Sequence, residues 1–232
     1  MTTGVRRQAF VDLSAIVENF ARSAPSPDRV LIDVRADAYG HGLVAVVLAL
    51  AEAGGSAFVV SRPADVTALA GVGITTATVY PPPPHASPVI GRSLYGLDAA
   101  PARSAFRLVG EVIAIKNVPA HRGVSYGYTY RTEKPTTLAL VALGFADGIP
   151  RVASNRAPVR IGGFTGRVTG RIAMDQFVVD LDGDTASVGD DAVLFGDAED
   201  GEPTLAQWAE ATGLASEVIV SGLGTRIERV YT

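Results

Sequence analysis

The stretch V-R-A-D-A-Y-G-H-G, residues 34–42, contains the residue types of a ligand-binding turn. It follows the apolar run R-V-L-I-D-V, which is typical of a buried parallel strand. Glycines on both sides of His41 favour a tight turn that would place backbone N–H groups and the Tyr39 hydroxyl at the carboxyl end of a sheet. Proteins with parallel sheets bind ligands there, and often phosphates. The sequence therefore predicts a ligand site around Tyr39, next to Arg35.

Two other patterns are weaker candidates for chemistry. Residues 123–127, G-V-S-Y-G, have the spacing of a hydrolase nucleophile turn, but that turn needs a following helix and the next residues are β-like. Asp180, Asp182 and Asp184 have the spacing of calcium-loop ligands, but Thr185 stands where that loop needs glycine. We interpret the first pattern as a strand turn and the second as an acidic hairpin loop, and we expect no metal.

The elements that must position these residues come in two kinds. Up to about Tyr80, short apolar runs alternate with helical patterns that end at glycine, which predicts βαβ units and a parallel sheet. Ser14 is the expected N-cap of the first helix. Residues 80–88, Y-P-P-P-P-H-A-S-P, predict a stiff extended connector, because consecutive prolines continue neither a helix nor a central strand.

From about Phe106 onward, short β runs separated by closely spaced turn residues predict an antiparallel, barrel-like β domain. Within it, residues 204–213 have a helical pattern with Gly213 as the stop signal. Residues 216–221, S-E-V-I-V-S, are expected to form a final strand.

Composition excludes several classes of protein. A chain of 232 residues with 47% apolar side chains and a mean hydropathy of +0.25 can form one large domain or two small ones. Scattered basic residues and a net charge of −4 argue against nucleic-acid binding. The absence of cysteine excludes thiol chemistry. With no long apolar run and no apolar leader, we expect a cytoplasmic protein without a membrane partner.

Several segments together resemble alanine racemase, the bacterial enzyme family that uses pyridoxal phosphate to interconvert L- and D-alanine: VRADAYGHG, GRSLYGL, GVSYGYTYRTEKPTTLALVALGFADGIPR, GRVTGRIAMDQFVVDL and GLGTRIERVY. The resemblance implies a (β/α)8 barrel followed by a C-terminal β domain, in a homodimer whose active sites are completed across the interface. We therefore predict an α/β plus β fold. A shortened, barrel-like α/β domain would span residues 14–98, and an antiparallel β domain would span residues 1–13 and 99–232.

The resemblance assigns roles to individual positions. Arg35 stands where the family has the lysine that bonds the cofactor and moves the substrate proton. Tyr39 and Gly91 match residues that contact the cofactor phosphate. Tyr126 matches the second catalytic acid/base, a tyrosine offered by the partner subunit. Met174 matches a residue whose backbone lines the pocket for the substrate carboxylate.

The sequence also departs from the family pattern. Phe145 stands where the family usually has a tyrosine, and Val89 replaces an arginine that faces the cofactor ring. An eightfold βα barrel takes about 200 residues or more, whereas the proline run begins after Tyr80. The resemblance therefore implies that roughly the fourth to seventh barrel strands are missing.

Arginine cannot replace the family's lysine, because its guanidinium stays protonated and has no free amine to bond an aldehyde. The chain has only two lysines, Lys116 and Lys134, and neither matches a cofactor-facing position. Two interpretations of Arg35 stay open: its guanidinium grips an anion, or its stem lies along the strand end with the charge in water.

These observations predict a catalytically inactive member of the family that binds a ligand or regulates, with pyridoxal phosphate implied but not covalently bound. Its ligand would be a small amino acid or an anion. One alternative is an active pyridoxal-phosphate-dependent alanine racemase. Another is an accessory subunit that supplies Tyr126 to a full-length racemase. A shortened barrel leaves open sheet edges, which predicts a homodimer.

Overall fold

The computed structural model describes residues 4–24, 26, 29–82, 88–97 and 102–232. The chain divides into two compact units, which we call the α/β unit (Phe10–Phe106 and Arg229–Thr232) and the barrel unit (Met1–Ala9 and Arg107–Glu228). Three strands continue from one unit into the other along the chain: β1 (Arg7–Val11), β6 (Phe106–Val118) and β14 (Glu228–Tyr231).

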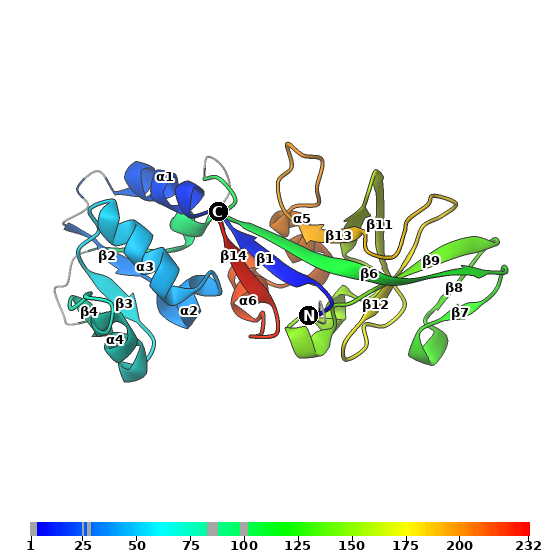
Figure 1. The fold of residues 1–232 in the computed structure, drawn as a ribbon, viewed down its shortest axis with the longest axis horizontal. Coiled ribbons are helices and arrows are strands. Elements are labelled where there is room, and N and C mark those ends of the chain that lie inside the picture. The colour runs from blue at the N-terminus through cyan, green and yellow to red at the C-terminus, as the bar shows by residue number, and fades with distance from the viewer. Residues whose placement is uncertain (1–3, 25, 27–28, 83–87, 98–101) are drawn as a thin grey trace. The chain divides into compact units, whose positions relative to one another are not determined.

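The α/β unit contains a four-stranded parallel sheet in the order β4-β3-β2-β5, and Figure 1 shows helices α1, α3 and α4 around it. Its elements, in chain order, are α1 (Leu13–Ser23), β2 (Leu31–Asp33), α2 (Arg35–Tyr39), α3 (Leu43–Glu52), β3 (Phe58–Val60), α4 (Pro63–Ala70), β4 (Ala77–Val79), β5 (Val89–Ile90) and the short 3-10 helix η2 (Arg92–Tyr95). Strands alternate with helices because short apolar runs alternate with helical patterns. The predicted βαβ units are therefore confirmed.

The first helix begins earlier than the sequence pattern indicates. Asp12, and not Ser14, is the N-cap, because its carboxylate accepts a hydrogen bond from the Ala15 N–H at 2.9 Å. The Ser14 hydroxyl lies inside the first turn and donates to the same carboxylate oxygen at 2.6 Å. The prediction of Ser14 as the cap was wrong by two residues, because serine and aspartate are both favoured caps and the sequence alone does not show which of them accepts the hydrogen bond.

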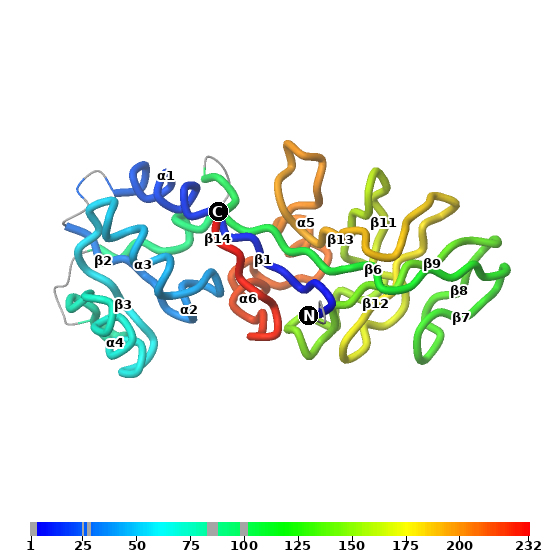
Figure 2. Tube along the Cα trace, viewed as in Figure 1, coloured from blue at the N-terminus to red at the C-terminus, as the bar shows by residue number. Residues whose placement is uncertain are grey.

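The barrel unit contains six antiparallel strands in the order β13-β10-β11-β12-β9-β6, and β13 also pairs with β6, which closes the barrel. The sheet continues beyond β6 with β1 and β14. The strands not yet located are β9 (Thr136–Val141), β10 (Pro158–Ile161), β11 (Phe164–Thr169), β12 (Phe177–Asp180) and β13 (Asp191–Phe195). Figure 2 shows the path of this unit, in which β6 runs beside β9. The predicted antiparallel barrel is confirmed.

Short elements occupy the connections of the barrel unit. They are the hairpin β7 (Gly123–Val124) and β8 (Tyr130–Arg131) and the 3-10 helices η3 (Tyr126–Tyr128), η4 (Phe145–Asp147) and η5 (Arg151–Ala153). The hairpin and its enclosed 3-10 turn present Tyr126, and η4 and η5 present Phe145 and Arg151. The candidate site residues of this unit therefore lie on tight turns.

Two helices close the barrel unit, and one of them corrects the sequence analysis. Helix α5 (Leu205–Thr212) forms as predicted and ends at Gly213 in the left-handed conformation. Residues 216–221, expected as a strand, form helix α6 (Ser216–Ser221), and the prediction was wrong. The β-branched residues favour a strand locally, but packing of the buried Ile219 and Val220, and of α6 against α5, overrides that preference.

Some expectations fall outside the described residues. The predicted proline connector includes residues 83–87, and the predicted domain boundary lies at residues 98 and 99, none of which the structure describes. The domain bounds 14–98 and 99–232 therefore stay a prediction. Within the described ranges, no helix is long and apolar enough to cross a membrane.

Candidate functional site

The motif after β2 folds as a left-handed turn. Ala36, Asp37, Ala38 and Tyr39 have φ angles of 51°, 58°, 53° and 54°. This conformation costs L-residues roughly 1–2 kcal/mol each, so tertiary contacts must hold it. One such contact is the hydrogen bond from the Ala36 N–H to the Ser61 hydroxyl at 2.8 Å.

Backbone N–H groups of the turn donate hydrogen bonds to carbonyl groups of the same turn. The N–H groups of Gly40 and Gly42 donate to the carbonyls of Ala36 and Asp37, each at 2.9 Å. The His41 N–H donates to the Ala38 carbonyl at 3.1 Å. The three N–H groups are therefore paired within the turn itself. A glycine-rich sequence indicates a turn but does not show where its donors point.

Arg35 and Tyr39 converge on the carboxylate of Asp33, the last residue of β2, and we call these three residues the Asp33 cluster. The Arg35 side chain makes a two-pronged contact, with Nε 2.8 Å from Oδ1 and Nη2 2.7 Å from Oδ2 of Asp33. The Arg35 N–H donates to Oδ1 at 3.1 Å, and the Tyr39 hydroxyl donates to Oδ2 at 2.9 Å. Asp33 itself is only 3% exposed.

The protonation states within the Asp33 cluster follow from these contacts. Burial alone would raise the pKa of Asp33, but the hydrogen bonds from Arg35 and Tyr39 outweigh it and hold the pKa below its ordinary value of 3.8. Burial and the Asp33 carboxylate raise the pKa of Tyr39 to about 12. At neutral pH the cluster is therefore a carboxylate, a guanidinium and a protonated phenol.

Aromatic rings and a glycine complete the surroundings of the cluster. The guanidinium carbon of Arg35 lies 4.2 Å from the centre of the Tyr80 ring, within cation–π range. The Tyr95 hydroxyl donates to the Asp33 carbonyl at 2.9 Å. A Cβ atom at Gly91 would lie 3.2 Å from the Tyr39 hydroxyl and 3.0 Å from the Asp33 Cβ. Gly91 therefore lies beside the cluster, and a side chain there would press against it.

His41 lies under the turn as a buried structural residue. Its Nδ1 lies 3.0 Å from both the Ala38 and Tyr39 carbonyl oxygens, so Nδ1 must carry the proton. Its ring is 4.7 Å from the ring of Tyr95 and 4.8 Å from that of Phe106. Burial lowers the pKa of His41 to about 4, which keeps it neutral at physiological pH.

Tyr126, in the barrel unit, is held between two arginines. Its hydroxyl accepts a hydrogen bond from Arg151 Nη2 at 2.5 Å and donates to the Ile172 carbonyl at 3.0 Å. The guanidinium carbons of Arg151 and Arg171 lie 5.7 Å and 5.6 Å from its ring centre. The neighbouring Ser125 donates to the Arg171 carbonyl at 2.6 Å, so its hydroxyl is a backbone anchor and not a nucleophile held by a base.

Met174 and Phe145 lie together on the barrel unit. The Met174 carbonyl accepts a hydrogen bond from the Ala146 N–H at 2.9 Å, and the Phe145 N–H donates to the Ala173 carbonyl at 3.0 Å. The Met174 side chain is 56% exposed. The Phe145 ring centre lies 5.5 Å from the guanidinium carbon of Arg151, which also binds Tyr126. The sequence-predicted site residues therefore form two groups, one within each unit.

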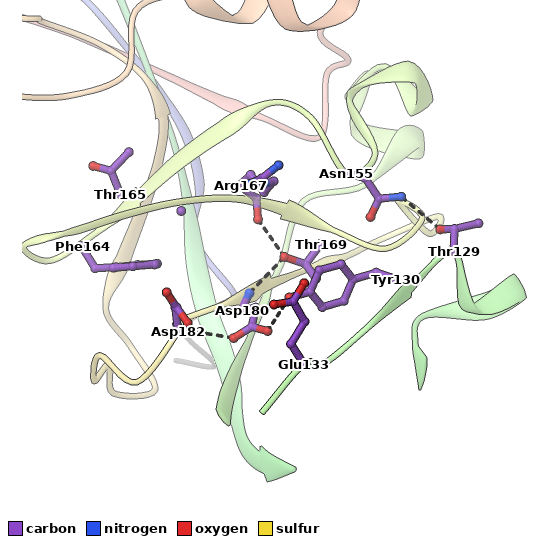
Figure 3. A pocket seen from close by; sticks show the side chains of 11 residues that line it. Thr129, Tyr130, Glu133, Asn155, Phe164, Thr165, Arg167, Thr169, Asp180 and Asp182 are labelled. Carbon is purple, nitrogen blue, oxygen red and sulfur yellow. Dashed lines mark hydrogen bonds between the residues drawn. The ribbon is translucent and has the colours of Figure 1, made fainter. Parts of the chain in front are cut away.

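A pocket of about 670 Å³ in the barrel unit lies apart from these residues (Figure 3). Two of its acidic lining residues have partners: Asp180 accepts hydrogen bonds from Tyr130 at 2.8 Å and from Thr136 at 2.6 Å, and Asp182 binds Lys134 at 2.9 Å. Asp180 and Asp182 of the acidic loop line it, whereas Arg35, Tyr39, Gly91, Tyr126 and Met174 do not. Over the described ranges, no three histidine or acidic side chains are placed to share a metal ion.

Comparison with known proteins assigns both units to the same family. The profile described as "Alanine racemase, C-terminal domain" matches residues 105–231, more than half of the chain. The profile described as "Alanine racemase, N-terminal domain" matches residues 11–94. This chain belongs to the alanine racemase family. The resemblance seen in the motifs is therefore confirmed, and members of the family depend on pyridoxal phosphate.

Relatives in the alanine racemase family show how much of the family length is present. The alanine racemase of Thermobifida fusca is 48% identical over 137 residues, which make up 59% of this chain and 37% of that relative. The chain therefore matches well under half of the length of this relative. A solved alanine racemase from a D-cycloserine-producing Streptomyces lavendulae is 27% identical with a TM-score of 0.88, covering 99% of this chain and 98% of the other.

A second solved alanine racemase, from Bartonella henselae, is described with covalently bound pyridoxal phosphate. It is 19% identical to this chain with a TM-score of 0.87, covering 99% of this chain and all of the other, and at that identity the likeness shows the fold alone. The fold of this chain is thus that of alanine racemases, with a partial barrel and a C-terminal antiparallel barrel.

Sequence reasoning did not single out Asp33, Arg151, Arg171 or Asp147. Asp33 carried a signal, because it is the one charged residue inside an otherwise apolar strand run. Asp147 is fully buried, accepts a hydrogen bond from the Gly144 N–H at 2.8 Å and pairs with Arg226 at 3.1 Å, which anchors the turn that carries Phe145. Its charged partner Arg226 lies far away in the sequence, so no local pattern indicates that this ion pair forms.

Proposed function

We propose that this member of the alanine racemase family does not racemise alanine and instead binds a small ligand or has a regulatory role. The observation that carries the proposal is the two-pronged contact of Arg35 with Asp33. Racemisation with pyridoxal phosphate needs an amine that bonds the cofactor and then moves a proton at the substrate α-carbon. The position that matches the family's lysine holds a guanidinium, whose hydrogen bond to Asp33 raises its pKa still further.

Neither lysine of the chain lies in the α/β unit, where it could take the place of the family's cofactor lysine. Lys116 and Lys134 both belong to the barrel unit. Lys116 is exposed on β6, and Lys134 pairs with Asp182 at 2.9 Å. The hydroxyl of Tyr39, which matches a phosphate-contacting position of the family, donates its hydrogen bond to Asp33 instead. The residues around Asp33 therefore do not fit pyridoxal phosphate as the family holds it.

Trapping the cofactor tests this proposal. The purified chain is incubated with pyridoxal phosphate, reduced with borohydride and weighed by intact mass spectrometry. We expect only the low, non-saturating labelling that exposed lysines give. The matched control is the double variant Lys116→Arg, Lys134→Arg. A stoichiometric adduct that saturates in the parent chain and is lost in the double variant would mean that one of these lysines holds the cofactor, and the proposal would fail.

A second candidate function is that of an accessory subunit for a full-length racemase. It is favoured by Tyr126, which matches the family's acid/base tyrosine, is 43% exposed and has its hydroxyl bound by Arg151 at 2.5 Å. A chain that works without a racemase partner would form a homodimer in the cytoplasm. An accessory subunit would instead replace one subunit of a racemase dimer. Sedimentation of the chain alone and mixed with the Thermobifida fusca racemase separates the two, since only an accessory subunit forms a mixed species.

A further inference from the structure

The Asp33 cluster has the composition of an anion-binding site that is already filled by its own carboxylate. A guanidinium fork and a phenol hydroxyl are donors suited to a carboxylate or a phosphate. Here they bind Asp33 through four hydrogen bonds of 2.7–3.1 Å, two on each oxygen. A carboxylate has about four lone-pair positions, so the acceptor capacity of Asp33 is used up by these partners.

The charge of Asp33 acts against a second anion at this place. A phosphate monoester carries about −1.5 to −2 charges at pH 7 and would be repelled by a buried carboxylate. Gly91 lies on the other side of the cluster, and a Cβ atom there would lie 3.0 Å from the Asp33 Cβ, so its lack of a side chain leaves this side uncrowded. The Arg35 side chain is 36% exposed and keeps a path to solvent, so the cluster is reachable from outside, although its Nε and Nη2 donors contact Asp33.

We propose that Asp33 is a built-in anion that blocks a latent phosphate-binding site formed by Arg35 and Tyr39, next to Gly91. This extends the proposed function, because it explains how the α/β unit keeps family residues such as Tyr39 while excluding the phosphate of the family's cofactor. The ligand class that the unblocked site accepts is a phosphate monoester or inorganic phosphate. The parent chain accepts neither at this place.

Removing the carboxylate tests the inference. Inorganic phosphate is titrated calorimetrically into the parent chain, into Asp33→Ala and into Asp33→Asn. Asp33→Ala frees the donors of Arg35 and Tyr39, and Asp33→Asn removes the charge while keeping the side-chain volume. We expect phosphate to bind Asp33→Ala at least tenfold more tightly than the parent chain, with a smaller gain for Asp33→Asn. Binding should weaken at high salt.

Two further variants locate the effect. Asp65→Ala is the matched control, since Asp65 is also buried and also pairs with an arginine of the same unit, Arg62, at 2.8 Å. It should leave phosphate binding at the parent level. The double variant Asp33→Ala, Arg35→Ala should lose the gain. Pyridoxal phosphate should compete with inorganic phosphate for Asp33→Ala, whereas pyridoxal, which lacks the phosphate, should not.

Several results would overturn the inference. One is phosphate binding to the parent chain as tight as to Asp33→Ala. Another is folded Asp33→Ala or Asp33→Asn, judged by circular dichroism, with no gain in binding. A third is a gain that survives removal of Arg35. Because the titration contains neither cofactor nor amino acid, its failure leaves the proposed inactivity untouched, and racemisation by the parent chain would overturn the proposed function without altering the phosphate result.

Discussion

At the residue scale, Asp33 and Arg35 stabilise each other as an ion pair. A carboxylate left alone at 3% exposure would cost several kcal/mol, whereas one that accepts four hydrogen bonds from an adjacent guanidinium, a backbone N–H and a phenol is compensated. Arg35 was identified from the sequence as the residue that removes the family's amine. Its partner was missed, because a pattern of residues along a strand does not say which side chains turn back toward each other.

His41 gives a prediction about pH. Its pKa is about 4 in the folded chain and ordinarily 6.5, so the unfolded chain binds a proton in that interval and the folded chain does not. Stability contributed by neutral His41 is therefore lost as pH falls from 6.5 toward 4, by about 3 kcal/mol in total. Urea unfolding at pH 7.0, 5.5 and 4.5 should show this loss.

The variant His41→Asn isolates that contribution. It keeps a donor for the Ala38 carbonyl but does not titrate, so its stability should fall less between pH 7.0 and 4.5 even though it starts lower. His121→Asn, at an exposed histidine of the barrel unit, is the matched control for the exchange itself. The Asp33 contribution does not interfere, because its lowered pKa affects stability only below about 3.8. An equal fall in the free energy of unfolding with pH for the parent chain and His41→Asn would contradict the role given to His41.

At the scale of elements, the left-handed turn after β2 is the feature that sequence reasoning described least well. Glycine at positions 40 and 42 indicated a turn, but the strained conformation also includes Ala36, Asp37, Ala38 and Tyr39, of which only aspartate adopts it with any ease. The geometry is imposed by the surroundings, through bonds such as that from the Ala36 N–H to Ser61. A local pattern cannot contain that information. The same limit explains helix α6, where burial against α5 overrode a strand-like sequence.

Glycine substitution tests the strain in this turn. Ala36 is exposed, so Ala36→Gly removes little packing and relieves the left-handed cost, and we expect it to stabilise the chain by about 0.5–1 kcal/mol. Ala68→Gly is the matched control, because Ala68 is an exposed alanine in the ordinary helix α4 and should lose about 1 kcal/mol. The measurement is the free energy of unfolding in urea. Destabilisation of similar size in both variants would argue against the strained turn.

At the scale of the whole molecule, the chain combines a partial barrel of parallel strands with a closed antiparallel barrel. Strand β5 pairs in parallel with β2, the first strand of the sheet in chain order, and β4 pairs with β3. Among the described pairings of this sheet, β4 and β5 are its two ends. The sequence allowed the two-part fold to be predicted from alternating apolar patterns, and the family to be predicted from long motifs. The contact that carries the proposed function joins Arg35 to Asp33, and it depends on side-chain orientations that a residue pattern does not specify.

The central claim is that the family fold persists here without the chemistry of the family. Exchange of the α-hydrogen of alanine measures that chemistry most directly, because it detects proton abstraction even when racemisation is too slow to follow. L-alanine and D-alanine are incubated in D₂O with pyridoxal phosphate, with and without the chain, and the loss of the α-proton signal is followed by NMR. We expect the chain to leave the slow rate of free pyridoxal phosphate unchanged. Exchange that rises in proportion to the chain concentration and saturates with pyridoxal phosphate would contradict the claim.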